Sequence, residues 1–240
     1  MKSLRLKHLT RNSSFLKIKD RYEILLSSFQ ITFFNIQESL INEIAIMRRL
    51  SHRNVLKLYE VYETKHSIYL VLEVITGGEL IKKIKEKAIY NEIDIARIMK
   101  NFLLALEHIH EQGTMHRDLK PENLLLRNEG DYFDIVIADF GLAAFKSEEN
   151  SKILFKRCGT PGFVAPEVLL YKDGQEGFYD EKCDVFSAGV IFYLLLTGRK
   201  LFAGADYKQI LRANKACQID FQLPFLKSLP SPSKQERDGL

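Results

Sequence analysis

The chain has 240 residues, of which 46% are hydrophobic and 28% are charged, and its formal net charge is +4. This length allows one large domain or two small lobes, and the composition is ordinary for a globular protein. A net charge this small gives no reason to expect nucleic acid as a partner. Residues 1–21 hold seven Lys or Arg against one Asp, which is typical of a solvated terminus and, less often, of a basic patch.

The cysteines Cys158, Cys183 and Cys217 are far apart in the sequence and form neither a metal-ligand spacing nor a disulfide framework. We therefore expect a reducing compartment and a cytoplasmic location. The N-terminus is basic and has no apolar signal-peptide core. Residues 185–198 form an apolar, uncharged run that is too short to span a bilayer, so we expect a buried helix there and no membrane partner.

Regular elements can be predicted from residue 35 onward, whereas residues 1–34 show no pattern and are expected to form an irregular basic segment. Glu43 lies on the apolar face of the first expected helix, where a carboxylate either sits at an exposed edge or needs a cationic partner. Residues 230–240 are rich in Ser, Pro and charge and predict a disordered tail. Apolar spacing predicts helices over 35–50, 79–87, 94–112, 184–197 and 205–214, and strands over 55–61 and 67–74.

Residues 114–141 concentrate polar and charged side chains around two short apolar runs, 124–126 and 135–138, whose polar connection predicts a hairpin. Two carboxylates, one ammonium and one carboxamide fall within 22 residues of this stretch. Bringing these groups together is costly unless something charged binds between them, and a metal-bound polyphosphate would fit. The side chains concerned are Asp118, Lys120, Asn123 and Asp139.

Three motifs in this half of the chain resemble those of eukaryotic protein kinases. His-Arg-Asp-Leu-Lys-Pro-Glu-Asn at 116–123 resembles the catalytic loop, Asp-Phe-Gly at 139–141 the metal-binding triplet, and Ala-Pro-Glu at 165–167 the end of an activation segment. The whole stretch from Gly159 to Glu167 is similar to Ser/Thr kinases of the calcium/calmodulin-dependent group. The resemblance covers roughly residues 35–226.

The resemblance implies an α+β, protein-kinase-like bilobal fold. A truncated, β-rich N-lobe would occupy residues 35–75, and a mostly helical C-lobe lacking its last helices would occupy 76–229. The implied activity is transfer of phosphate from ATP, with Mg²⁺, to protein Ser or Thr hydroxyls. The alternative is a catalytically impaired, kinase-like interaction module or a fragment of a normal kinase.

The same resemblance assigns roles to the residues of the polar cluster. Asp118 would orient the acceptor hydroxyl, and Lys120 would offset charge on the transferred phosphate. Thr160 would contact both, which favours Ser/Thr over Tyr as the acceptor. Asn123 and Asp139 would supply oxygen ligands to Mg²⁺.

ATP would bind along residues 70–75 by the same resemblance. Leu72 would gate the back of the adenine pocket, the backbone of Glu73 and Ile75 would pair with the base, and Leu125 would pack beneath it. Glu79 would reach the ribose.

Substrate choice and regulation are less fully encoded. The resemblance suggests that Glu79 and Glu122 attract a basic residue upstream of the target Ser or Thr. Arg117 would pair with a phosphate on the activation segment, but Lys156 occupies the position that takes phosphate in some relatives, so activation by phosphorylation is not expected. Calmodulin dependence cannot be read from the sequence, because no basic amphipathic segment follows the kinase-like region. The remaining candidate phosphate acceptors on this segment are Ser147 and Ser151.

The chain also departs from the family pattern. No glycine precedes Gly77, so a glycine-rich phosphate loop is absent. Either Lys2, with an insertion after it, or Lys17 would be the strand lysine that partners Glu43. The arginine that would pair with Glu167 is not encoded, so Glu167 is either exposed or destabilising for its lobe.

Overall fold

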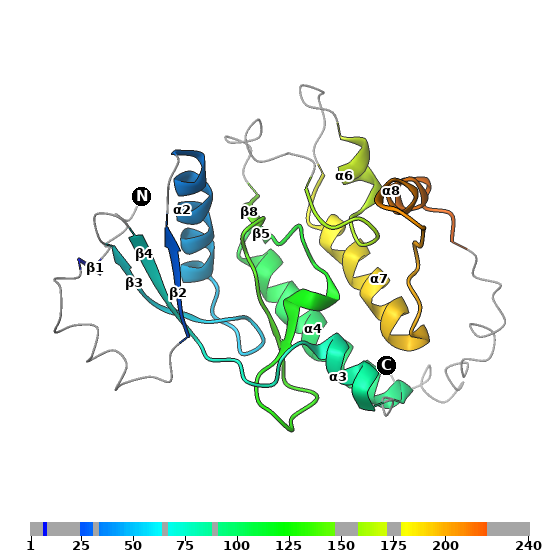
Figure 1. The fold of residues 1–240 in the computed structure, drawn as a ribbon, viewed down its shortest axis with the longest axis horizontal. Helices are drawn as coiled ribbons and strands as arrows, with labels where there is room; N and C mark the ends of the chain where they lie inside the picture. The colour runs from blue at the N-terminus through cyan, green and yellow to red at the C-terminus, as the bar shows by residue number, and fades with distance from the viewer. Residues whose placement is uncertain are drawn as a thin grey trace.

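We describe a computed structural model of the chain, which covers residues 7–8, 25–30, 34–63, 67–87, 91–146, 158–171 and 179–219. Strands β1–β4 and helix α2 form one end of the molecule, and helices α3, α4, α6, α7 and α8 form the other (Figure 1). The short strands β5–β8 lie between these two groups, where the chain passes through the polar stretch of residues 114–141.

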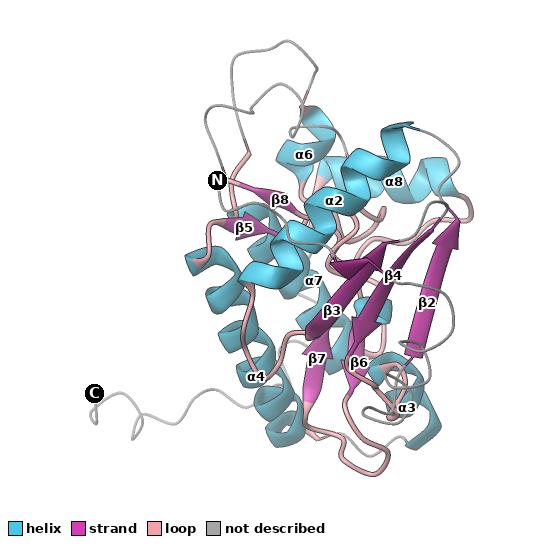
Figure 2. Cartoon of the chain, turned by 90° about the vertical axis from the view of Figure 1, so that its left-hand side faces the viewer, coloured by secondary structure: helices cyan, strands magenta, loops and turns pink. Residues whose placement is uncertain are grey.

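The N-terminal end is a four-stranded sheet in the order β1-β3-β4-β2. Strand β4 is antiparallel to both of its neighbours, and β1 is parallel to β3. Helix α2 lies against the sheet (Figure 2), and together they enclose a small apolar core. The elements are β1 (Lys7–His8), β2 (Leu25–Gln30), α2 (Phe34–Arg49), β3 (Leu58–Glu63) and β4 (Ser67–Leu72). Buried side chains of this core are Leu40, Ile44, Val61, Ile68 and Leu70.

Strand β2 corrects the expectation that residues 1–34 are wholly irregular. Its sequence, Leu-Leu-Ser-Ser-Phe-Gln, has no apolar alternation, so pattern reading missed it. Its residues pair in register with β4, from Leu25 opposite Leu72 to Gln30 opposite Ser67. Neighbouring-strand hydrogen bonds, which a single sequence does not display, therefore define this strand.

The C-terminal part is mainly helical and begins with the helices that the sequence predicted. Helix α4 starts at an Asn91 cap, whose side chain accepts a bond from the Asp94 N–H, and ends before Gly113 in a left-handed conformation (φ 66°). The elements are α3 (Leu80–Lys87), α4 (Glu92–Glu111), β5 (Thr114–Met115), η1 (Pro121–Asn123), β6 (Leu124–Leu126), β7 (Ile135–Ile137), β8 (Ala144–Phe145), α6 (Pro166–Leu170), α7 (Lys182–Thr197) and α8 (Tyr207–Ala216).

The predicted hairpin is confirmed, since β6 and β7 pair antiparallel with Leu124 opposite Ile137. The strand expected to begin at Val55 begins instead at Leu58. Val55 forms a separate parallel bridge to Ile137, so this stretch attaches the N-terminal part to the hairpin. One large core then continues from the end of α2 through α4, the hairpin and α7.

Helix α7 is only partly the central helix that its apolar sequence predicted. Its buried face includes Asp184, Ala188 and Ile191, but Val185 is 52% exposed and Phe192 is 40% exposed. The described elements cover one side of the helix and leave these two side chains outside the packing. Among the described helices, none is both long enough and apolar enough to cross a membrane.

Candidate active site

The carboxylate of Asp118 is the centre of the candidate site. It is 7% exposed, accepts a hydrogen bond from Thr160 Oγ1 at 2.6 Å on one oxygen, and contacts Lys120 Nζ at 2.6 Å on the other. Burial alone would lower the pKa of Lys120, but the bond to Asp118 and the charges of Asp118 and Asp139 raise it, so the ammonium stays charged. The structure thus joins Thr160 to Lys120 through the carboxylate that both contact.

A second carboxylate, Asp184 at the start of α7, holds the backbone of this loop. It is fully buried and accepts bonds from the N–H groups of His116 at 2.8 Å and Arg117 at 2.7 Å, and from His110 Nε2 at 2.9 Å. Arg117 is in the left-handed region (φ 67°), which costs free energy for a residue with a Cβ. The two backbone bonds to Asp184 offset that cost and set the direction in which Asp118 emerges.

The side chain of Arg117 connects the loop to two further segments. Its Nε donates to the Leu142 carbonyl at 2.7 Å, and its Nη1 donates to the Tyr179 hydroxyl at 3.0 Å. Burial raises the pKa of Tyr179, so its hydroxyl stays protonated, and it lies 3.9 Å from Cys158 Sγ. Arg117 therefore connects the loop that carries Asp118 to the segment after Asp139 and to the residues that precede α7.

Asn123 and Asp139 lie beside the Asp118 loop. Asn123 donates from Nδ2 to the Asp118 carbonyl at 2.9 Å, and its own carbonyl accepts the Ala138 N–H at 3.0 Å. Asp139 is exposed, adopts a left-handed conformation (φ 65°), and accepts the Gly141 N–H at 3.3 Å. These bonds hold an amide and a carboxylate at adjacent ends of the hairpin.

The buried side chain of Phe140 restricts the orientation of the neighbouring Asp139. Phe140 is fully buried, and its ring centre lies 5.0 Å from that of His116. Because the aromatic side chain is locked in the core, the neighbouring carboxylate of Asp139 is left facing outward. His116 is also buried, and burial lowers its pKa despite the nearby carboxylates, so it packs as a neutral ring.

The donor set fits magnesium. Mg²⁺ takes hard oxygen ligands, keeps several waters, and is usually held by one or two carboxylates together with substrate phosphates. Asp139 supplies such a carboxylate and Asn123 such an amide oxygen. Among the described residues no group of three or more His, Cys, Asp or Glu side chains is placed to hold a metal, so a Mg²⁺ held by Asn123 and Asp139 would need further oxygen ligands, such as those of a polyphosphate.

Helix α2 brings Glu43 close enough to Asp139 for the two charges to interact. The helix is docked by Asn42 Nδ2, which donates to the Ala143 carbonyl at 2.9 Å. Burial, and then the charge of Asp139, raise the pKa of Glu43, and no described cation is among the groups acting on it. The candidate partners Lys2 and Lys17 both lie outside the described residues, so their assignment stays a prediction.

The expected adenine pocket has its apolar residues at the junction of the two parts. Leu72, at the end of β4, packs against both the small core and the large core. Leu125 is half-buried between the fully buried Leu124 and Leu126, so its side chain points away from the C-terminal core. Leu125 and Glu79 form a backbone bridge, which places Glu79 next to this surface.

The structure adds the surroundings of four acidic residues that the sequence analysis discussed. Glu73, expected to contribute backbone to the base, makes a side-chain ion pair with Arg127. Glu79 contacts Lys82 Nζ at 2.5 Å, whereas Glu122 is exposed. Glu167 is exposed as well, which is one of the two alternatives that the sequence analysis left open.

The site residues that the sequence reasoning missed are those that support the loop from a distance. Asp184 appeared only as the first position of the helix expected over 184–197, and Tyr179 and His110 were not singled out. The available signal was Asp184 itself, an acid at the start of the most apolar helix, because a buried carboxylate needs donors. The donors lie 67 to 74 positions away in the chain, so they could not be named from one sequence.

Comparison with known proteins agrees with this geometry. Residues 29–238 match the family model for the protein kinase domain. Calcium/calmodulin-dependent protein kinase type 1 of Macrobrachium nipponense is 41% identical over 202 residues, covering 82% of this chain and 55% of that protein. The Caenorhabditis elegans protein of the same name is 39% identical over 198 residues, covering 82% of this chain and 55% of the relative.

A further relative is calcium-dependent protein kinase 4 of Plasmodium falciparum, 42% identical over 200 residues, with 82% of this chain and 36% of the relative covered. The chain thus spans about half the length of the calcium/calmodulin-dependent kinases that it matches, and less of this one. The family match, the Asp118 cluster and the two-part fold lead to one conclusion: the chain belongs to the protein kinase domain family and is similar to its calcium/calmodulin-dependent group.

Proposed function

We propose that the chain transfers the γ-phosphate of ATP to Ser or Thr hydroxyls of proteins, with Mg²⁺ as the metal. The observation that carries this proposal is the Asp118 carboxylate, held at 2.6 Å by both Thr160 and Lys120. Membership of the protein kinase domain family supports it. A cytoplasmic location is part of the proposal, and the three free cysteines are compatible with it.

Phosphoryl transfer needs positioning and charge compensation more than covalent help. Asp118 would accept a hydrogen bond from the acceptor hydroxyl and hold its oxygen in line with the γ-phosphate. Lys120, which remains charged, would offset the negative charge that spreads over the transferred group. Thr160 fixes the carboxylate between them, so neither group has to reorganise during the reaction.

When bound, Mg²⁺ would supply positive charge to the phosphates of ATP. Asn123 and Asp139 are the residues of this chain that would hold it. The base would lie on Leu125 and against Leu72, with the backbone of Glu73 and Ile75 at its edge.

The proposed substrates are proteins with a basic residue upstream of the acceptor, selected by Glu79 and Glu122. The exposure of Glu122 supports this assignment. The contact between Glu79 and Lys82 opposes part of it, because a substrate arginine would have to displace Lys82. We therefore expect a moderate preference for basic peptides rather than an absolute requirement.

The second candidate is a kinase-like interaction module that does not transfer phosphate. The observation that favours it is the raised pKa of Glu43, which burial and the charge of Asp139 cause and which no described cation opposes. Glu43 belongs to the half of the site that would contact phosphates from the N-terminal side. The two candidate functions thus differ in whether the residues around Asp118 are sufficient for phosphate transfer.

The test is transfer of labelled phosphate from Mg-ATP to matched basic peptides that present Ser, Thr or Tyr. We expect transfer to Ser and Thr peptides, weak or no transfer to the Tyr peptide, and a loss of about 100-fold or more in Asp118→Asn. Asp131→Asn is the matched control, because Asp131 accepts backbone bonds in a turn that an Asn oxygen can also accept. Equal rates in the wild type and Asp118→Asn, at background level, would favour the interaction module.

A further inference from the structure

The loop that follows α2 is attached to α4 by two histidines. The N–H of Ser51 donates to Nε2 of His108 on α4 at 3.1 Å. Within the loop, the N–H of Asn54 donates to Nδ1 of His52, also at 3.1 Å. The two imidazole rings stack, with their centres 5.4 Å apart and their planes 25° from parallel. The stacked pair of His52 and His108 therefore accepts both of these backbone hydrogen bonds.

These contacts require neutral rings. An imidazole nitrogen accepts an N–H only through a free lone pair, so Nε2 of His108 and Nδ1 of His52 must be unprotonated. Adding a proton to either ring removes one acceptor and places a cation against the other ring. Burial, His108 and Arg53 lower the pKa of His52, in keeping with this arrangement.

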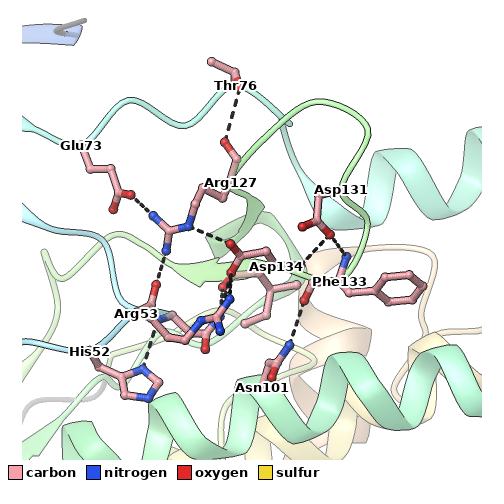
Figure 3. Close-up of polar contacts among 11 residues, drawn as sticks. His52, Arg53, Glu73, Thr76, Asn101, Arg127, Asp131, Phe133 and Asp134 are labelled. Carbon is pink, nitrogen blue, oxygen red and sulfur yellow. Dashed lines mark hydrogen bonds and ion pairs between the residues drawn. The ribbon is translucent and has the colours of Figure 1, made fainter. Parts of the chain in front are cut away.

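A second attachment of the same loop does not depend on histidine. Arg127 pairs with Glu73 and with Asp134, and also donates to the carbonyl of Arg53 (Figure 3). Asn54 Nδ2 donates to the Ile135 carbonyl at 2.6 Å. The loop would therefore stay attached to the hairpin when the histidine contact is lost, and only its attachment to α4 would change.

The charged groups around the pair come from several elements. His52 lines a cavity of about 390 Å³ together with Arg53 of its own loop, and with side chains from the N-terminal part and the hairpin. Those side chains are Lys57, Glu73, Arg127 and Asp134. Since Glu73 and Asp134 are both paired with Arg127, they offer little counter-charge to an added proton on His52.

The attachment matters for the active site because Ser51 lies two residues after the end of α2. A helix moves as a rigid rod over this length, so its last turn and Glu43 move together. At Asn42 the helix is held to the segment that follows Asp139, and at Ser51 it is held to α4. The hydrogen bond from Ser51 to His108 thus fixes the C-terminal end of α2, the helix that carries Glu43.

We propose that His108 is a positioning residue for the phosphate transfer proposed above, and that it holds α2 in place only while the stacked His52–His108 pair is uncharged. This inference rests on the proposed function for its catalytic readout, but the attachment itself can be measured without turnover. It assigns no direct contact between His108 and the substrate.

The test compares His108→Gln, whose amide oxygen can accept the Ser51 bond without titrating, with His108→Ala, which cannot. Phosphate transfer and melting temperature are measured between pH 5 and pH 8, with Lys100→Gln on the exposed face of α4 as the control. From pH 8 to pH 5 the wild type and the control should lose more transfer and more thermal stability than His108→Gln does. His108→Ala should transfer about fivefold more slowly even at pH 8, the effect of one lost hydrogen bond.

Identical pH profiles of activity and melting temperature in the wild type and His108→Gln would overturn the inference. The melting profiles also separate it from the proposed function. A wild type that transfers no phosphate, yet loses its pH-dependent stability in His108→Gln, would refute the kinase activity and keep the attachment.

Discussion

Each side of the candidate site presents a carboxylate, and the two carboxylates have opposite surroundings. On the catalytic-loop side, Asp118 has a hydroxyl donor and an ammonium within 2.6 Å. On the α2 side, Glu43 lies half-buried beside the like charge of Asp139, with no described cation acting on it. The first carboxylate is stabilised by its neighbours and the second is not.

This difference indicates that the two sides of the site are held in place by different contacts. The loop side is built from contacts within the C-terminal part, and a buried Asp184 fixes its backbone before any ligand binds. The α2 side depends on a helix with one hydrogen bond at its middle, from Asn42 to the Ala143 carbonyl, and one just past its C-terminal end, from Ser51 to His108. Substitutions on the loop side should therefore cost both stability and activity, whereas those on the α2 side should separate the two.

The largest effect is expected for Asp184→Asn. The substitution removes the charge that accepts two backbone N–H groups and His110, in a fully buried place. Removing one partner from such a buried set of charged contacts costs about 3–5 kcal/mol of unfolding free energy. The loop that carries Asp118 should also shift, which lowers phosphate transfer by roughly 100-fold.

Denaturant unfolding and phosphate transfer by the same preparation check this prediction. Ser187→Ala, one turn further along α7, removes a hydroxyl that bonds the Phe163 and Cys183 carbonyls and should cost less stability. An Asp184→Asn variant as stable and active as the wild type would show that the loop is not held from α7.

Thr160→Val should give the next largest effect on activity. The substitution keeps the shape of the side chain and removes the hydroxyl that donates to Asp118. A hydrogen bond to a charged group contributes about 1.5–3 kcal/mol, so kcat should fall roughly 10- to 100-fold. Thr160→Ser should retain most of the rate, and steady-state kinetics with a Ser peptide measure both. Equal losses in the two variants would assign the effect to packing and not to the hydroxyl.

Glu43→Gln should separate stability from activity. Because the pKa of Glu43 is raised in the folded chain, its ionised form opposes folding at neutral pH, and stability is regained as pH falls through that raised pKa. The Gln variant should therefore melt at the same temperature as the wild type or up to about 4 °C higher at pH 7, with slower phosphate transfer.

Melting curves between pH 5 and pH 8 check this, and the difference between the variants should shrink towards pH 5. A clear fall in melting temperature at pH 7 would reveal that Glu43 has a cationic partner in the ligand-free chain. The comparison between the two sides of the site would then fail.

The smallest effect is expected for Lys82→Ala. Its ammonium is 66% exposed, and exposed ion pairs contribute only about 0.2–1 kcal/mol. Freeing Glu79 should lower KM for a peptide with an upstream Arg by roughly 1.5- to 5-fold and leave a peptide with Ala at that position unchanged. Peptide kinetics beside Lys100→Ala measure it, and a rise in KM for the Arg peptide would exclude Glu79 as the group that recognises it.

The sequence predicted the loop side of the site well because the information there is local. The catalytic-loop and metal-triplet motifs and the hairpin lie within 28 consecutive residues, 114–141, and the structure confirms the hairpin. The expected contact of Thr160 with Asp118 is present. The roles of these residues in catalysis stay predictions, because geometry alone does not test them.

The rest could not be predicted because it depends on packing between distant segments. Strand β2 has no alternating pattern and exists through its pairing with β4. The support of the catalytic loop by Asp184 and the stacking of His52 on His108 join residues more than 50 positions apart. The exposed side of α7 is the opposite case. Its apolar sequence predicts burial, but the described elements do not cover that face.

In the proposed function, Asn123 and Asp139 hold Mg-ATP next to an Asp118 carboxylate that is already in position. The most direct measurement is calorimetric titration of ATP into the purified chain, with and without Mg²⁺, for the wild type, Asp139→Asn and Asp118→Asn. The account predicts Mg²⁺-dependent binding that Asp139→Asn loses and Asp118→Asn retains. A folded wild type that binds ATP equally with and without Mg²⁺, or not at all, would contradict it.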